Sequence, residues 1–363
     1  MSSPSNHRAM STRGISFISS AESHPKTSDH SSFQPFDSQQ KQAIGSKRSN
    51  RNLLGLRFLS FNVSIDEPEE PLTATLASPC NDQVILDQWH PLLPLEEVSV
   101  DEVATLVLLG EEIAYTKSAD DQVRAWRSAD DSKQPLPTTT RYLYIWVSLG
   151  SPPETLFDIP EFTEPDRRNV HGGTIGVHVS APRAIENFLD MGHFPYVHTD
   201  VLGAEPHTEV AEYNVHIDPD TNDVWATECV FYQPRAATTS TEGQMSDYLY
   251  RVPHPYCVIL YKTSPLFDDR MDVIALFCRP VAADRIEAHM FLSLLDPDNS
   301  NTVIRKFQQG IFGQDKPILE NQHPKLLPLD PRSETPIRAD KVAIAYRRWL
   351  SDLGVTYGVI PIA

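Results

Sequence analysis

Residues 185–200, which read IENFLDMGHFPYVHTD, place two histidines five positions apart with a proline between them. The start of this stretch favours a helix, in which a spacing of five leaves two side chains about 140° apart. Pro195 has no backbone N–H and clashes with the preceding turn, so we predict that the helix ends or kinks near Phe194. Such a kink would return His198 to the face that carries His193, where both rings could bind one metal ion.

An aspartate precedes the first histidine by three residues. Asp190 is therefore predicted to share the helix face of His193 and to hydrogen-bond the second nitrogen of its ring. Carboxylates in this position orient metal-bound imidazole rings. The pattern predicts a metal site, and a partly buried helix with hydrogen-bonded histidines is the alternative interpretation.

The segments that flank this stretch favour a central antiparallel sheet. Residues 174–180 alternate before it, and four apolar segments bounded by Pro, Asp, Asn or Gly follow it: VWATECVFY, DYLYRV, YCVILYK and IEAHMFLSLL. Short apolar segments with such boundaries are typical of antiparallel strands.

Two helices are predicted near the end of the chain. Val303, Phe307 and Ile311 recur at a spacing of four and would form the apolar side of the first helix. The second, within residues 338–354, carries an apolar stripe and is expected to stop at Gly354. A central antiparallel sheet that grips a long helix is the simplest α+β arrangement of these parts.

The first half of the chain differs in character. Residues 1–80 are predicted to be a disordered Ser-rich extension, because the first 60 hold fifteen serines and eight Lys or Arg against three acids. An organelle transit peptide and an over-long start are the alternatives. Residues 85–162 are predicted to be β-rich, with apolar runs on both sides of Gly110 and within residues 141–150. The proline-punctuated segment 151–166 favours a linker to a second domain.

Charge and cysteine content exclude several classes of protein. The formal net charge is −18, and residues 61–363 hold 46 acids and 23 bases, so a nucleic-acid partner is not expected. The four cysteines are scattered, which argues against a disulfide framework and favours a reducing compartment. No apolar run is long enough to span a bilayer. We therefore expect a cytoplasmic protein with no membrane partner.

The segment ENFLDMGHFPYVH resembles the mononuclear-iron motif of the α subunits of Rieske-type aromatic-ring-hydroxylating oxygenases. In that family both histidines bind a non-haem Fe(II), and the aspartate before them relays electrons. The resemblance implies that His193 and His198 are iron ligands and that Asp190 is the electron relay.

A second segment, FQQGIFGQDKPILENQ, resembles the part of the monooxygenase branch that supplies the third ligand, which would be Asp315. Two histidines and one carboxylate form the facial triad that leaves positions open for oxygen chemistry. The resemblance also implies the fold: a degenerate all-β Rieske-like domain over residues 85–162, then a helix-grip (START-like) catalytic domain over residues 166–363.

The chain departs from the family at the Rieske cluster. A member should carry a C-x-H and a C-x-x-H segment that hold a [2Fe–2S] cluster. This sequence has neither, and no cysteine lies between Cys80 and Cys229. Segments such as DQWHPLLPLEEV and RYLYIWVSLGSP still resemble Rieske-domain strands, but only fourteen residues separate Trp126 from Arg141, where the family places both cluster loops. We expect no cluster in this chain and an electron supply from another protein.

Within the family, the chain resembles the methylxanthine N-demethylase oxygenases, and among them the cluster-lacking type that acts on 7-methylxanthine. The segments that carry this likeness are RAIENFLDMGHFPYVHTDVLGAEPHTEVAEYNV, FQQGIFGQD and AYRRWL. The resemblance implies an Fe(II)- and O2-dependent monooxygenase that demethylates a methylxanthine-like aromatic heterocycle. It also implies a Rieske- and flavin-bearing reductase that delivers electrons from NADH, and a trimer-type homo- or hetero-oligomer.

Two alternatives stay open. The chain could be a non-catalytic subunit that stabilises a hetero-oligomeric ring-hydroxylating oxygenase, or a hydrolase that uses zinc at the same three ligands. No substrate-binding residue is assigned. Tyr256, Tyr261 and Phe291 are candidates for the pocket wall, and core packing explains them equally well.

Overall fold

The computed structural model describes residues 78–362. All but the last three residues of the predicted extension at 1–80 therefore lie outside the described residues. No helix in the described part of the chain is long and apolar enough to cross a membrane.

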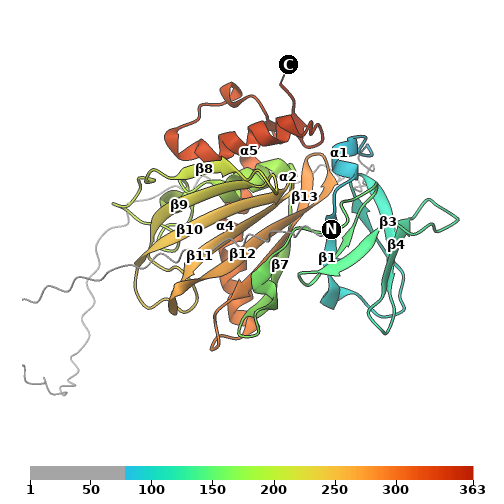
Figure 1. Ribbon diagram of the computed structural model, residues 1–363, viewed down its shortest axis with the longest axis horizontal. Coiled ribbons are helices and arrows are strands. Elements are labelled where there is room, and N and C mark those ends of the chain that lie inside the picture. Colours follow the sequence, from blue (N-terminus) through green and yellow to red (C-terminus); the bar gives the residue numbers. More distant parts are fainter. Residues whose placement is uncertain (1–77, 363) are drawn as a thin grey trace, which may run out of the picture. The chain divides into compact units, whose positions relative to one another are not determined.

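A seven-stranded antiparallel sheet forms the centre of the fold (Figure 1). Its strands, in spatial order, are β7 (Arg168–Val177), β13 (Arg285–Leu294), β12 (Phe267–Ala282), β11 (Cys257–Ser264), β10 (Gln244–His254), β9 (Val224–Gln233) and β8 (Asn214–Ile217). All four segments predicted to follow the histidine motif form strands of this sheet, namely β9, β10, β11 and β13.

Strand β12 was missed by the sequence pattern, although it is the longest of the sheet. Acids and a proline interrupt its apolar run. Asp272 is nonetheless buried, because its carboxylate accepts a hydrogen bond from the backbone N–H of Leu295 at 2.8 Å. Pro280 lies where the pairing with β13 shifts register, a position at which strands tolerate proline.

Helices cover one face of the sheet. They are α2 (Ala181–Leu189), α3 (Phe194–Val197), α4 (Asn301–Asn321) and α5 (Lys341–Asp352). The long helix α4 packs against β7 and α2, while α5 packs against α2, β8 and β9. This arrangement confirms the predicted α+β fold with a helix gripped by an antiparallel sheet.

The predicted apolar faces of α4 and α5 agree with the structure to different extents. In α5 the apolar stripe is buried, and Gly354 follows the helix with a positive φ of 79°, as predicted. In α4 the prediction holds in part: Phe307 and Ile311 are half-buried and line a cavity, but Val303 is 46% exposed, and the fully buried side is offset by one residue, through Ile304 and Gln308. The reason is that α4 turns polar residues, Gln308 and Asp315, towards the sheet.

Two small antiparallel sheets precede the central one. The first has the order β1 (His90–Pro94), β6 (Tyr144–Val147), β5 (Thr138–Arg141), and the second has the order β2 (Ala104–Leu108), β3 (Glu111–Lys117), β4 (Val123–Arg127). The predicted runs around Gly110 form the β2–β3 hairpin, in which Leu109 and Gly110 both have positive φ, as a type I′ turn requires. The remaining short elements are α1 (Gln83–Leu86), β14 (Leu327–Pro328), β15 (Val359–Ile360) and the 3-10 helices Leu95–Glu97, Pro160–Thr163, Pro331–Ser333 and Arg338–Asp340.

An aromatic cluster joins the β1–β6–β5 sheet to the central sheet. Tyr144 and Trp146 of β6 pack edge-on against Phe277 of β12, with ring centroids 5.7 and 5.1 Å apart. Tyr261 and Phe291 belong to this same cluster. The central sheet is therefore covered on both faces, by aromatic residues on one and by the helices on the other.

Candidate metal centre

The helix that carries the histidine motif ends earlier than the sequence predicted. Ser180 caps the start of α2, and the helix ends at Leu189, with Asp190 as its extended C-cap at φ −83° and ψ 115°. The predicted break near Phe194 is therefore wrong. Pro195 instead lies in the first turn of α3, where a helix tolerates proline because the backbone N–H would have no partner anyway.

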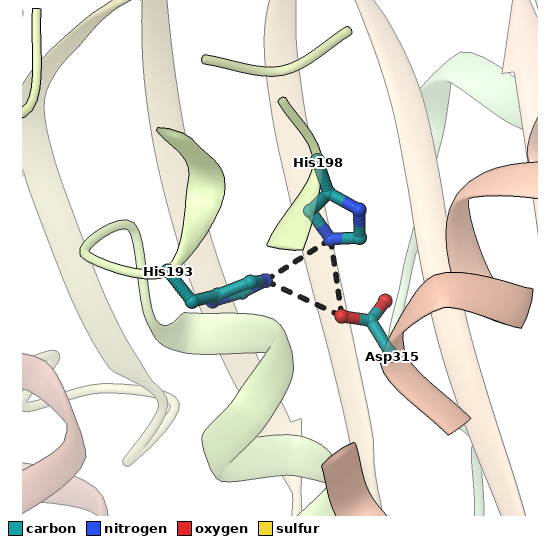
Figure 2. Close-up of side chains that lie close together, drawn as sticks. All are labelled: His193, His198 and Asp315. Carbon is teal, nitrogen blue, oxygen red and sulfur yellow. Dashed lines mark hydrogen bonds and ion pairs between the residues drawn. The ribbon is translucent and has the colours of Figure 1, made fainter. Parts of the chain in front are cut away.

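The two histidines converge because they flank one short helix. His193 is the N-cap of α3 and His198 is its C-cap. Figure 2 shows both rings turned towards each other, with Asp315 approaching from α4. Their Nε2 atoms lie 3.1 Å apart, and Oδ1 of Asp315 lies 3.3 Å from Nε2 of His193 and 3.0 Å from Nε2 of His198. The structure thus brings all three predicted ligands together.

Hydrogen bonds hold the outer nitrogen of each ring. Nδ1 of His193 lies 3.2 Å from Oδ2 of Asp190, whose Oδ1 accepts the backbone N–H of Gly192 at 2.7 Å. Nδ1 of His198 lies 2.8 Å from Oε1 of Gln314. Because carboxylate and amide oxygens are acceptors, each Nδ1 is the donor, so the Nε2 atom of each ring is the one that would offer its lone pair to a metal. The sequence predicted the contact of Asp190 but not that of Gln314.

Charges in this cluster shift the pKa values of its members. Burial works against protonation of His193, but the carboxylates of Asp190 and Asp315 outweigh it and raise the pKa of His193 to about 9. Burial also opposes ionisation of Asp315, yet the two histidines lower the pKa of Asp315 to about 2. The carboxylates therefore attract positive charge to this point, which a divalent cation would supply.

The three side chains fit a metal ion. Their ligand atoms form a triangle with sides of 3.0, 3.1 and 3.3 Å. Metal–ligand bonds of about 2.1 Å place neighbouring ligand atoms about 3.0 Å apart at right angles and about 3.4 Å apart at tetrahedral angles. Oδ1 of Asp315 is buried and has no hydrogen bond of good geometry within the described residues. The triangle therefore has the size expected for three ligands of one metal ion.

A cavity opens at the triad. It holds about 630 Å³ of space not filled by atoms, its mouth included, and all three ligand residues lie in its wall. Its aromatic walls are Phe188, Phe194, Tyr248, Tyr250, Phe307 and Phe312. The earlier candidates do not line it: Tyr261 and Phe291 belong to the aromatic cluster on the other face of the sheet, and Tyr256 donates its hydroxyl to the carbonyl oxygen of Tyr357. The alternation of DYLYRV could have revealed Tyr248 and Tyr250, since residues two apart share one face of a strand.

Comparison with known proteins shows which families this chain resembles. Residues 177–355 match the family described as the vanillate O-demethylase oxygenase C-terminal domain. The probable methylxanthine N7-demethylase NdmC of Pseudomonas sp. (strain TJI-51) is 46% identical over 274 residues, which cover 76% of this chain and 96% of that protein. The methylxanthine N1-demethylase NdmA of Pseudomonas putida is 27% identical over 220 residues, which cover 59% of each chain.

The fold agrees with a solved structure. Pseudomonas putida CBB5 NdmA with caffeine matches with a TM-score of 0.60 and 20% identity, over 74% of this chain and 90% of that chain. The relative that is 46% identical, matched over nearly its whole length, confirms the resemblance seen in the sequence. The chain belongs to the methylxanthine N-demethylase family of Rieske-type oxygenases, which are oxidoreductases.

Proposed function

We propose that this chain is the oxygenase component of an Fe(II)- and O2-dependent monooxygenase that demethylates a methylxanthine-like heterocycle. His193, His198 and Asp315 would hold the iron, and Asp190 would relay electrons to it. One observation carries the proposal: the three ligand atoms converge at the wall of a largely apolar cavity, and Asp190 contacts the outer nitrogen of His193.

The reaction requires both oxygen and electrons. An N-methyl group, O2, two electrons and two protons give an N-hydroxymethyl group and water. The C–N bond of this hemiaminal then breaks, which releases formaldehyde and leaves an N–H group on the ring. When bound, Fe(II) supplies the oxygen chemistry, which protein side chains lack.

The protein has two separate tasks at this site. Side chains of α2, α3 and α4 line the cavity, exclude water and would hold the planar ring with one methyl group towards the triad. Asp190 and Gln314 fix the ring orientations of the two histidines. Neither task needs an Fe–S cluster in this chain.

A second, more open cleft lies at Asp190. This carboxylate is 33% exposed and lines the cleft together with His193, which also lines the cavity. We expect a Rieske- and flavin-bearing reductase to dock here and to pass electrons from NADH through Asp190 to His193. Asp340 also lines the cleft, whereas Glu334 is already paired with Arg183 and Arg347, so Asp190 and Asp340 are the carboxylates that favour a docking face with basic residues.

The chain would be organised as the sequence predicts. Residues 85–162, which contain the sheets β1–β6–β5 and β2–β3–β4, would be a Rieske-like domain without cluster ligands, and residues 166–363 the catalytic domain. We expect a trimer-type oligomer in the cytoplasm.

The test combines metal analysis with turnover. The purified protein should bind about one iron per chain and lack the visible absorption of a [2Fe–2S] cluster. A methylxanthine panel with O2, NADH and a Rieske-bearing reductase should yield formaldehyde. His193→Ala should lose iron without unfolding, whereas His216→Ala, at an exposed histidine on β8, should keep it. Full iron retention in folded His193→Ala would contradict the proposal.

The lack of cluster ligands also favours a second candidate, a non-catalytic subunit. In that case the chain would co-purify with a cluster-bearing homologue, and His198→Ala would leave the activity of the complex unchanged. A fall in activity supports the oxygenase. Zinc in place of iron, in protein purified without added metal, would favour a hydrolase instead.

A further inference from the structure

Four buried polar side chains of the central sheet line the cavity. They are Gln233 on β9, Tyr248 and Tyr250 on β10, and Lys262 on β11, with exposed fractions of 1%, 1%, 1% and 4%. Oε1 of Gln233 and both tyrosine hydroxyls have no hydrogen-bond partner among the residues that the structure describes. A buried polar atom without a partner destabilises the folded protein, because it has lost its hydrogen bonds to water. A ligand with matching polar groups would remove that cost.

Lys262 places a hydrogen-bond donor beside these groups. It pairs directly with Tyr248 in the β10–β11 register, so both side chains leave the same face of the sheet side by side. An ammonium group has three N–H donors. Within the described part of the chain, one hydrogen bond of Lys262 is present, to the carbonyl oxygen of Ala236. At least one donor is therefore available to an acceptor in the cavity.

The carboxylate of Asp272 indicates which kind of ligand acceptor fits beside Lys262. It pairs with Lys262 in the β11–β12 register and is itself buried. A ligand carboxylate would place a second anion beside this single cation, away from water, where unbalanced charge is costly. A neutral carbonyl oxygen would accept a hydrogen bond from Lys262 without adding charge.

Gln233 adds a second requirement for the ligand, an N–H group next to the carbonyl group. A carboxamide carries a donor and an acceptor on one end, so it can form two parallel hydrogen bonds to a C(=O)–N–H edge. Glutamine recognises the donor–acceptor edge of adenine in this way. A ring that presents an N–H next to a carbonyl group would therefore satisfy the unpaired Oε1 of Gln233.

We propose that Gln233, Tyr248 and Lys262 determine substrate specificity by binding the polar edge of a neutral cyclic amide. Lys262 and Tyr248 donate to a ring carbonyl oxygen, and Gln233 accepts from an adjacent ring N–H. The inference rests on the proposed function, since it concerns the same cavity. It narrows the substrate to heterocycles that keep at least one ring N–H beside a carbonyl group.

Two ligands isolate the role of the ring N–H. 7-Methylxanthine and caffeine share the 7-methyl group and both carbonyl groups, but caffeine has methyl groups in place of both N–H groups of the six-membered ring. Their affinities are measured by calorimetry with the iron-loaded full chain, without O2 or reductase, so that no turnover occurs. The wild-type protein should bind 7-methylxanthine about 10-fold more tightly than caffeine, the effect of one buried hydrogen bond.

The variants separate the two contacts. Gln233→Met should abolish the preference for 7-methylxanthine. Lys262→Met should weaken both ligands alike, by about 10- to 100-fold, because a charged donor is lost. Tyr248→Phe should weaken both by a smaller factor. Tyr256→Phe is the matched control: this buried hydroxyl donates to the carbonyl oxygen of Tyr357, outside the cavity wall, so binding should be unchanged.

Each contrary outcome has a distinct meaning. Wild-type binding of 7-methylxanthine together with an unchanged preference in folded Gln233→Met overturns this inference alone. Tighter binding of vanillate, lost in Lys262→Met, overturns it in favour of an aromatic carboxylate. A wild-type protein that binds no methylxanthine contradicts the proposed function as well. If Gln233→Met does not fold, Gln233→Glu is tested instead. The Glu side chain keeps the hydrogen-bond acceptor, so the preference for 7-methylxanthine should persist while the affinities for both ligands fall. A lost preference would contradict the assignment.

Discussion

Gly203 lies against the backbone of the helix between the two histidines, which makes it a sensitive test of the site. A Cβ atom at this position would lie 2.6 Å from the backbone N of Pro195 and 2.8 Å from the carbonyl carbon of Phe194. Carbon atoms in ordinary contact are about 3.5–4.0 Å apart. Since both neighbours are backbone atoms, Gly203→Ala must move α3 or its own loop by close to 1 Å. We expect a shift of His193 and His198, which flank α3.

A displacement of about 1 Å in a catalytic group can lower a rate by about 100-fold. Gly203→Ala should therefore reduce turnover by about this factor and lower the iron content per chain, both measured on folded protein. The matched control is Gly313→Ala on α4, two residues before Asp315, where an added Cβ meets nothing within 4 Å. The control should keep its iron and gain up to about 1 kcal/mol of stability. Wild-type iron content and turnover in Gly203→Ala would refute the reasoning.

Three further perturbations test separate parts of the structure. Asp190→Asn should keep its iron but lose about 100-fold in reductase-driven turnover, because a neutral amide replaces the anion at His193. Peroxide supplied in place of O2 and electrons should restore part of this activity. Glu186→Ala removes a mostly buried carboxylate that Arg347 binds at 2.6 and 2.9 Å, while Arg347 keeps its second partner, Glu334. Chemical unfolding should show a loss of about 1.5–3 kcal/mol, against under about 1 kcal/mol for Glu320→Ala, which breaks a half-exposed ion pair. Burial lowers the pKa of His90 to about 4, so only the unfolded chain takes up this proton between pH 6.5 and 4. The contribution of His90 to stability should be complete above pH 6.5 and fall by about 3 kcal/mol towards pH 4, beside those of other buried histidines such as His171, and His90→Gln should reduce the slope of the pH profile there by that amount.

The sequence predicted the fold where apolar patterns were uninterrupted. Strands with clear boundaries, such as those after residue 220, form as expected. β12 escaped prediction because its polar residues find partners only in the folded sheet, as Asp272 does with the backbone of β13's end. The offset of the fully buried side of α4 has a related cause: Gln308 and Asp315 are buried although they are polar, and an apolar pattern alone cannot identify such positions.

The cavity was hardest to predict, because its walls come from elements far apart in the chain. Gln233 and Lys262 are separated by an entire strand, and neither belongs to a local motif. The alternation within one strand shows which residues share a face, but not which face meets the triad. That information comes from the register of β9, β10 and β11 and from the position of α4 above them.

The convergence of the two histidines depends on both local sequence and tertiary contacts. The predicted convergence of His193 and His198 holds, but a kinked helix is not its cause; the two residues stand at opposite ends of a single turn. A helix of four residues is not stable by itself, since its nucleation cost exceeds what so few hydrogen bonds return. Contacts from elsewhere must hold it: Phe194 packs against Phe231 of β9 with ring centroids 5.4 Å apart, and Gly203 closes on its backbone. A spacing of five thus brings the two histidines together only where tertiary contacts hold this turn in place. The same strands that hold it also form the wall of the cavity.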